Sequence, residues 1–472
     1  MGLATLAQDL AHEVETRVAG LGEALLDPVI RLGVTGLARA GKTVFITSLV
    51  SNLLDRGRMP GLRAQAEGRI EAVWLQPQPD MTVPRFDYEA HRAALTGPTP
   101  RWPASTREVS ELRLSFRLQR RGLAGAVRGA RVVHLDIIDY PGEWLLDVAL
   151  LDLGYREWSD RVLGQLSDRP EAAAWLGQAR AAAGAAAFAE EAARALHESY
   201  VQTLSALRQA GYSDVTPGRF LMPGALAGSP ALTFVPLPRP DDPRRGSLWR
   251  EMARRYDAYR DRVARPFFRD HFARIDRQAV LVDALEAIHA GPAALEDMRR
   301  AMAQVLAAFR PGRRGNALTE LVRGRRVGRI LFAATRADHL HHTQHPRLAA
   351  ILAAMLREAK DRADFAGAHT AAMAIASLRA TTETEVRRDG RVIPAVQGRL
   401  LDTGKAVAMH AGDLPEDPGR LLDPARGGAD GWLDGDYSVM RFAPAPLTLT
   451  PGLGLPHIRL DRAAEFLLGD RL

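Results

Sequence analysis

The chain of 472 residues has no cysteine, so it can form neither a disulfide nor a thiolate metal site, and this absence favours a cytoplasmic setting. It also lacks an apolar run long enough to span a bilayer, and its N-terminus lacks the apolar centre of a secretory signal. No basic stripe interleaved with aromatic residues occurs, so we expect no nucleic-acid partner. The net charge of +7 still permits contact with an anionic surface, and peripheral membrane association stays open as an alternative.

Lysine is scarce as well: it occurs only at positions 42, 360 and 405, although the chain has 63 basic residues. Residues 36–43 read GLARAGKT, a full match to the phosphate-binding loop pattern GxxxxGK[ST]. An apolar segment at 29–34 precedes this loop and an apolar helical run at 44–54 follows it, which is the strand-loop-helix context that such a loop needs. A lysine kept here in an arginine-rich chain indicates that a compact ammonium is required.

The residues of this loop have distinct expected roles. We expect Gly36 and Gly41 to let the backbone wrap around a phosphate chain, because glycine tolerates the close approach. Lys42 is expected to reach the β- and γ-phosphates, and the Thr43 hydroxyl to ligate Mg²⁺. The other expected nucleotide contacts of this segment come from Ala38, Arg39, Ala40 and Val44.

A second motif ends an apolar strand predicted over 132–138. Residues 139–142 read DYPG and match DxxG, the pattern that senses Mg²⁺ and the γ-phosphate in GTPase-type loop proteins. We expect Asp139 to hold Mg²⁺ through water and the Gly142 amide to bond the γ-phosphate. The DxxG pattern alone is weak evidence for a nucleotide site, because such turns are common. Its place after a phosphate-loop pattern makes this evidence stronger.

Glu143 follows this motif, at a position where small GTPases often have a water-positioning glutamine. Its carboxylate could polarise the attacking water, but it would also repel the γ-phosphate, so we expect slow turnover. In the second interpretation Glu143 begins the next helix, where its charge suits the positive end of the helix dipole. Both interpretations stay open.

The first switch is expected to contribute Thr106 to the magnesium site, with Ser105 as the alternative. Catalysis of phosphoryl transfer is mostly positioning and charge neutralisation, so a further cation would raise the rate. We hypothesise that Arg39, inside the phosphate loop, acts as an arginine finger in cis; the alternative is that it points to solvent or pairs with the helical insertion. Arg101 and Arg107, which flank the first switch, are rival cations.

A third motif follows an apolar strand predicted over 329–334. Residues 335–338 read TRAD and match the guanine-reading pattern [NT]KxD, except that arginine replaces lysine. Asp338 would accept hydrogen bonds from N1–H and the exocyclic amine of guanine, which adenine cannot supply, whereas the alternative is a turn in which Asp338 caps a helix. Arg336 could cover the base with its stem and planar head. The expected nucleotide residues here are Thr335, Arg336 and Asp338, with Ser377, Leu378 and Arg379 as the weaker base-supporting loop.

Hydrophobic periodicity predicts the elements around these motifs. Residues 57–108 show weak periodicity, and we predict mostly loop. Residues 112–118 alternate as a half-buried strand, joined to 132–138 by a hairpin. Further apolar strands alternate with helical segments, which predicts an α/β fold with a mostly parallel sheet and helices on both faces. These strands are expected at 279–285, 329–334 and 372–377, and the helical segments at 293–309 and 346–364.

Helical patterns without strands, at 170–208 and 248–273, predict a large helical insertion. An apolar stripe at 3–26 predicts a helix packed on the nucleotide domain, with a membrane-surface or partner-binding helix as the alternative. Residues 387–391 predict a tight hairpin, and 460–472 a docking helix. The predicted organisation is an N-terminal amphipathic helix at 1–28, the two halves of the nucleotide domain at 29–142 and 274–380, the insertion at 143–273, and a C-terminal hairpin, loops and docking helix at 381–472.

Four histidines follow the guanine-reading pattern, at positions 339, 341, 342 and 345. His341 and His345 have a helical spacing that suits zinc, but the glutamate of a metalloprotease motif is missing. We therefore favour a polar surface turn over a metal site.

With these motifs together, the chain resembles the YcjX-like family of bacterial stress-associated P-loop GTPases. The most specific stretches are GLARAGKTVFITSLVSNLL, DYPGEWLLDVALL, RQAVLVDAL, FAATRADH and PHIRLDRAAEFLLGDRL, and the resemblance covers essentially the whole chain. It implies a Ras-like nucleotide domain that carries a helical insertion and binds GTP or GDP with Mg²⁺. The family's loop typically has lysine where this chain has Arg336, and we expect the guanine preference to survive this change.

The leading hypothesis is a guanine-nucleotide switch with slow GTP hydrolysis, acting in a bacterial stress response in the cytoplasm or at the inner membrane. One alternative is an ATP-using P-loop enzyme in which Asp338 is only structural. Another is a scaffold or membrane-stress adaptor that binds nucleotide for stability and hardly hydrolyses it. A protein partner would bind through the helical insertion.

Overall fold

The computed structural model describes most of the chain, namely residues 27–36, 40–104, 108–119, 130–185, 187–270, 274–307, 327–365, 367–388, 390–427 and 440–472. Several predictions fall elsewhere and are not tested by it. The predicted helix at 3–26 lies outside the described residues, as do Ala38, Arg39, Ser105, Thr106 and Arg107.

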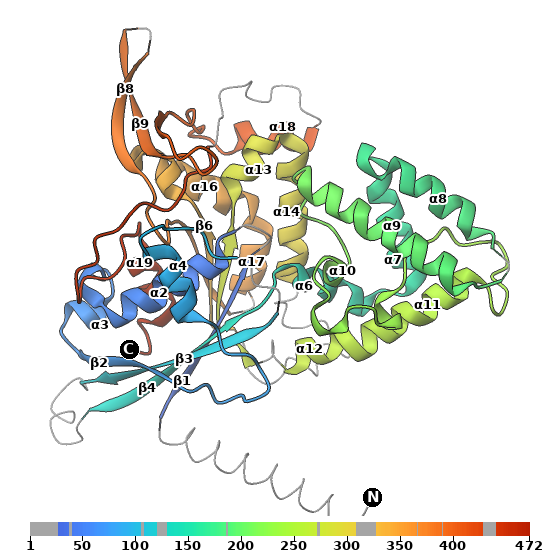
Figure 1. The fold of residues 1–472 in the computed structure, drawn as a ribbon, viewed down its shortest axis with the longest axis horizontal. Helices are drawn as coiled ribbons and strands as arrows, with labels where there is room; N and C mark the ends of the chain where they lie inside the picture. The colour runs from blue at the N-terminus through green and yellow to red at the C-terminus, as the bar shows by residue number, and fades with distance from the viewer. Residues whose placement is uncertain are drawn as a thin grey trace, which may run out of the picture.

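A seven-stranded sheet in the order β2-β3-β4-β1-β5-β6-β7 forms the centre of the molecule (Figure 1). The strands are β1 (Val29–Gly36), β2 (Ile70–Gln76), β3 (Ser110–Leu118), β4 (Arg131–Asp139), β5 (Arg277–Val282), β6 (Arg329–Ala334) and β7 (His369–Ala374). All neighbouring pairs from β4 to β7 are parallel, and β3 runs antiparallel to both of its neighbours. The predicted mostly parallel α/β sheet is confirmed.

Two hydrophobic layers cover the sheet, because its central strands are apolar on both faces. On one face α2 (Lys42–Leu54) and α19 (Leu460–Leu468) pack against β1 and β5 through fully buried side chains such as Leu49 and Leu467. On the other face lie α13 (Ala284–Ala290), α14 (Pro292–Ala307), α16 (His345–Met355) and α17 (Arg357–Phe365). The predicted docking helix at the C-terminus is therefore confirmed as α19.

The described residues between β4 and β5 contain helices and turns but no strand, as predicted for an insertion. Figure 1 shows these helices gathered on one side of the sheet. They share an aromatic core in which the rings of Trp158 and Tyr256 stack 5.0 Å apart. The helices are α6 (Glu143–Leu146), α7 (Tyr155–Ser167), α8 (Ala173–Ala183), α9 (Glu190–Gln209), α10 (Gly218–Leu221), α11 (Leu248–Tyr259) and α12 (Arg265–Asp270).

A small antiparallel sheet follows β7 and extends away from the main sheet (Figure 1). Its strands are β8 (Thr382–Arg388), β9 (Arg391–Arg399) and β10 (Ala406–Met409). Gly390 has a φ of 76°, the left-handed conformation that a tight hairpin turn requires, so the predicted hairpin is confirmed. In the part of the chain that the structure describes, no helix combines the length and apolarity needed to cross a bilayer.

Two predictions about the early part of the chain need correction. More than half of the described residues in 57–108 lie outside helices and strands, as predicted, but the segment also contains the edge strand β2 and the helix α4 (Tyr88–Thr96), which the prediction missed. The partial exposure of β2 explains its weak hydrophobic pattern. Strand β3 is buried on both faces, because its polar residues find partners on β4: Arg113 pairs with Asp136 at 2.6 Å, and the Ser115 hydroxyl lies 2.8 Å from His134 Nδ1.

Candidate functional site

The phosphate-binding pattern lies between β1 and α2, at the carboxyl end of the parallel strands. Gly41 has a φ of 80°, which is the left-handed region that favours glycine. A Cβ at Gly36 would lie 2.7 Å from Leu281 O, so this end of the loop is packed directly on β5. Lys42 Nζ donates to Gly36 O at 3.2 Å, which draws the ammonium across the loop. These described ends have the backbone geometry that a phosphate cradle requires.

The DxxG pattern meets this loop from the neighbouring strand. Asp139 ends β4 and is the Cα partner of Val34 on β1, and it is almost fully buried. A Cβ at Gly142 would lie 2.2 Å from Gly36 O, so only glycine lets the two turns approach so closely. Tyr140 anchors the turn by donating to Gln278 Oε1 at 2.7 Å. The structure thus brings the predicted γ-phosphate sensor against the phosphate loop.

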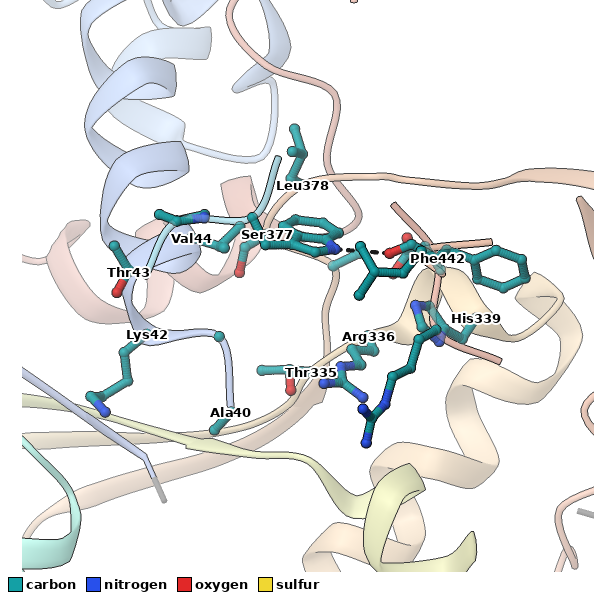
Figure 2. A pocket seen from close by; sticks show the side chains of 17 residues that line it. Ala40, Lys42, Thr43, Val44, Thr335, Arg336, His339, Ser377, Leu378 and Phe442 are labelled. Atoms are coloured by element: carbon teal, nitrogen blue, oxygen red, sulfur yellow. Dashed lines mark hydrogen bonds between the residues drawn. The ribbon is translucent and has the colours of Figure 1, made fainter. Parts of the chain in front are cut away.

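A cavity of about 260 Å³ joins the phosphate loop to the two predicted base loops (Figure 2). Lys42 and Thr43 lie at one end of it, and His339 and Phe442 lie at the other. Such a crevice outside the carboxyl ends of parallel strands is the usual ligand position in α/β folds. The predicted residues that line it are Ala40, Gly41, Lys42, Thr43, Val44, Thr335, Arg336, Asp338, Ser377 and Leu378.

Asp338 links the two base loops. Its Oδ2 accepts a hydrogen bond from the Ala380 amide at 2.8 Å, and its backbone carbonyl accepts one from the Thr381 hydroxyl. The residue is 5% exposed and lines the cavity. Arg379, predicted to contact nucleotide, is not among the lining residues, because its Nε donates to Thr381 O at 3.0 Å.

Arg336 takes a left-handed conformation, with a φ of 58°, at the start of the guanine-reading turn. Its Nη1 pairs with Asp283 Oδ2 at 2.9 Å and with Glu286 Oε2 at 3.0 Å, so the head of the side chain is fixed by α13. Asp283 also caps α13 by accepting from the Glu286 amide, and burial raises the pKa of its carboxyl. This cap agrees with the helix-capping role expected of an aspartate at a strand end.

Glu143 is the first residue of α6, which agrees with the second of its two interpretations. Its side chain is 3% exposed, and Oε1 accepts from Arg208 Nη2 on α9 at 2.9 Å. A buried carboxylate needs such a partner, because burial of an unpaired charge is costly. Whether Glu143 also polarises water stays a prediction.

The chain that follows Glu143 is held by the helical segment. Asp147 is 1% exposed and accepts from the Gly218 amide at 2.8 Å, the Arg219 amide at 3.3 Å and the Tyr259 hydroxyl. The Arg219 guanidinium lies 3.5 Å from the centre of the Trp144 ring, a cation–π contact. Residues 143–147 are therefore clamped between the DxxG turn and α10.

The clamp at Asp147 has a pH dependence, because burial raises the pKa of its carboxyl to about 6 from 3.8. The neutral form is favoured in the folded chain, so its stabilising contribution is complete below about pH 4 and is lost as the pH rises through about 6. We expect the free energy of unfolding of the natural chain to fall by about 3 kcal/mol relative to Asp147→Asn over this range. Urea unfolding of both proteins between about pH 4 and pH 7 measures this difference. Parallel stability curves would contradict the raised pKa.

The four histidines do not share a helix face. His339 and His345 are buried, and His345 Nε2 lies 2.7 Å from Ala337 O, so the prediction of a surface turn was wrong for these two. His341 and His342 are more accessible and lie beside Glu383 of β8, with His342 Nδ1 3.0 Å from Glu383 Oε2. The helical spacing that suggested zinc is therefore absent, because His341 precedes the helix that His345 begins.

Several lining residues of the cavity were not predicted. Trp102 and Phe442 close it at the base end, and Trp102 Nε1 donates to Phe442 O at 2.8 Å. These two residues are 340 positions apart in the sequence, in segments without a strong pattern. A lone tryptophan before the first switch is a weak signal, and nothing in the sequence pairs it with the C-terminal segment.

Residues 30–472 match the model of the YcjX-like family. A protein of Escherichia coli K12 named Ras-like GTPase YcjX is 35% identical to this chain, over 95% of the chain and 97% of that protein. A protein of Shewanella oneidensis MR-1 with the same name is 34% identical, over 98% of each sequence. The similarity thus extends over the sheet and the helical segment together.

Proposed function

Because the chain belongs to the YcjX-like family, we propose that it binds GTP and GDP with Mg²⁺ and hydrolyses GTP slowly. The observation that carries this proposal is the single cavity in which Lys42 and Thr43 face the loops that contain Asp338 and Ser377. A phosphate cradle alone would suit many nucleotides. A buried aspartate at the far end of the same cavity favours guanine, since its carboxylate accepts from N1–H and the exocyclic amine.

The polyphosphate is proposed to bind along the segment from Gly36 to Val44, with backbone amides and Lys42 as donors. Thr43 and Asp139 would hold Mg²⁺, together with Thr106 from the first switch. When bound, Mg²⁺ neutralises charge on the β- and γ-phosphates. The close fit of Gly142 against Gly36 supports this arrangement, because it leaves the DxxG amide beside the phosphate loop.

We propose that the protein acts as a switch in the cytoplasm, in a bacterial stress response. The clamp on residues 143–147 supports this role, because any movement of Gly142 on γ-phosphate binding would be transmitted to α9 and α10. A protein partner would then read the nucleotide state on the helical segment. Peripheral membrane association would add a second docking surface.

A second candidate function is a nucleotide-stabilised scaffold or membrane-stress adaptor with negligible hydrolysis. The burial of Glu143 favours it, because a carboxylate fixed beside the γ-phosphate position opposes the charge that develops there. Protease sensitivity of residues 85–110 and 143–160 distinguishes the two. A switch would show different cleavage with GDP and GTP, and a scaffold would not.

Release of phosphate from GTP by the purified full chain tests the proposed function. We expect slow turnover in Mg²⁺ that stops with a chelator, and no comparable release from ATP. If GTP binds but no phosphate forms, the scaffold function replaces the enzyme. If ATP is the better substrate, the guanine assignment is wrong.

A further inference from the structure

A second cavity, of about 150 Å³, lies between the phosphate loop and the helical segment. Ala40 of the phosphate loop lines both this cavity and the nucleotide cavity, so the two adjoin at the loop. Glu143, which follows the DxxG pattern, lines the second cavity as well. It therefore borders the part of the site where the γ-phosphate is proposed to lie.

Two cations are among the described residues that line this second cavity, Arg208 and Arg441. Arg441 is 51% exposed, lines the nucleotide cavity too, and pairs loosely with Glu286 at 3.5 Å. Arg208 lies near the end of α9, is 27% exposed, and pairs with Glu143 Oε1 at 2.9 Å. Of the two, Arg208 is bonded directly to the segment that is proposed to sense the γ-phosphate.

The Glu143–Arg208 pair is asymmetric. Glu143 is buried and Oε2 has no hydrogen-bond partner, so Arg208 supplies the one ion pair seen for this carboxylate among the described residues. Arg208 can take a second anionic partner, because a γ-phosphate beside Glu143 would add negative charge that attracts the guanidinium. Arginine suits this role, since its five N–H donors can bind carboxylate and phosphate together.

We propose that Arg208 is a catalytic cation that the helical segment supplies in cis. This inference rests on the proposed GTPase function. With GTP bound, the guanidinium keeps an N–H on Glu143 and donates its other N–H groups to the γ-phosphoryl oxygens. The water oxygen forms its bond to the γ-phosphorus, the bond from that phosphorus to the β–γ bridging oxygen breaks, and GDP leaves with the electron pair. One proton of the water stays on the oxygen that is now bonded to phosphorus, the other passes to a second oxygen of the inorganic phosphate, and Arg208 neutralises the charge without being consumed.

The first test compares Arg208→Ala with Arg194→Ala. Arg194 lies on the same helix and also pairs with a glutamate, Glu190 at 3.1 Å, but it is 64% exposed. We expect Arg208→Ala to lower GTP turnover at least about 100-fold, with GDP affinity changed less than about threefold, as for loss of an arginine finger. Arg194→Ala should hydrolyse GTP and bind GDP as the natural chain does. Arg208→Lys, which keeps the charge that Glu143 needs, should fold normally and recover only part of the rate.

A second readout is independent of turnover. GDP with aluminium fluoride mimics the transferring phosphoryl group, so we expect it to slow the dissociation of a fluorescent GDP from the natural chain but not from Arg208→Ala. A merely structural Arg208 would leave this effect of aluminium fluoride intact. If aluminium fluoride slows dissociation equally in both proteins, the catalytic role is wrong.

The double variant Glu143→Gln/Arg208→Ala separates catalysis from charge balance. If Arg208 only neutralises Glu143, the double variant should hydrolyse GTP as fast as Glu143→Gln alone, and the inference would be overturned. We expect the double variant to be at least about 100-fold slower than Glu143→Gln. A natural chain that fails to bind GDP or to hydrolyse GTP would instead refute the proposed function.

Discussion

Asp338→Asn is expected to shift the nucleotide preference from guanine to xanthine by about 1000-fold or more, measured as the ratio of GDP to XDP affinity. A carboxylate accepts from both N1–H and the exocyclic amine of guanine, whereas an asparagine amide repels that amine and donates to the carbonyl that xanthine carries instead. The amide oxygen of the asparagine can keep the hydrogen bond from Ala380, so the two base loops should stay joined.

Competition of GDP and XDP against a fluorescent guanine nucleotide measures this change. Asp361→Asn is the matched control, since Asp361 is an exposed residue of α17 away from the cavity. The control should keep the preference of the natural chain. An unchanged ratio in Asp338→Asn would reduce Asp338 to a turn residue that holds the base loops together.

Lys42→Ala is expected to weaken GDP binding about 100- to 1000-fold and to abolish measurable GTP turnover, since loss of one partner of a close charge pair costs several kcal/mol. The ammonium already lies across the loop, where it donates to Gly36 O. Lys42→Arg should weaken GDP binding and lower GTP turnover almost as much, because the guanidinium is too bulky for the loop that Gly36 and Gly41 form. Equilibrium binding of GDP to each variant measures the effect.

The chain offers a matched control for this change. Lys360 is another of its three lysines and pairs with Asp364 at 2.8 Å on the surface of α17. Lys360→Ala should bind GDP as the natural chain does. Tight GDP binding by Lys42→Ala would mean that the pattern at 36–43 is a glycine turn and not a phosphate site.

Much of the architecture could be predicted because its signals are local. The glycine-rich loop at 36–43, the apolar strand ending at Asp139 and the turn at 335–338 each carry their pattern within a few residues. In a parallel sheet the carboxyl ends of the strands meet, so placing these turns after strands was enough to bring them together. The cavity that joins Lys42 to Asp338 follows from that arrangement.

The contacts that could not be predicted join distant segments. The sequence around Arg113 does not show that Asp136 of the neighbouring strand pairs with it. The alternation of polar and apolar residues therefore predicted a strand with only one buried face. Strand β2 lies at the sheet edge and lacks the alternation that marks a strand with one buried face. Glu143 and Arg208 are 65 positions apart in the sequence, so no local pattern indicates that a cation on α9 pairs with the residue after the DxxG motif.

Buried contacts join residues 143–147, which follow the DxxG turn, to the helical segment. A Cβ at Gly218 would lie 2.0 Å from Glu143 O, so α10 packs on this segment without room for a side chain. Asp147 accepts a hydrogen bond from the Gly218 amide of the same helix, and the Trp144 ring contacts the Arg219 guanidinium. A displacement of Gly142 therefore cannot occur without strain at this contact, because packed interiors are not freely deformable.

The most direct test of the central claim is equilibrium titration of the nucleotide-free full chain with fluorescent GDP, GTP and ATP in Mg²⁺. The cavity predicts that both guanine nucleotides bind at least about 100-fold more tightly than ATP, because adenine does not supply the two N–H donors that guanine offers to the buried Asp338 carboxylate. Equal or tighter binding of ATP would contradict the account and leave a P-loop protein whose base loops do not read guanine.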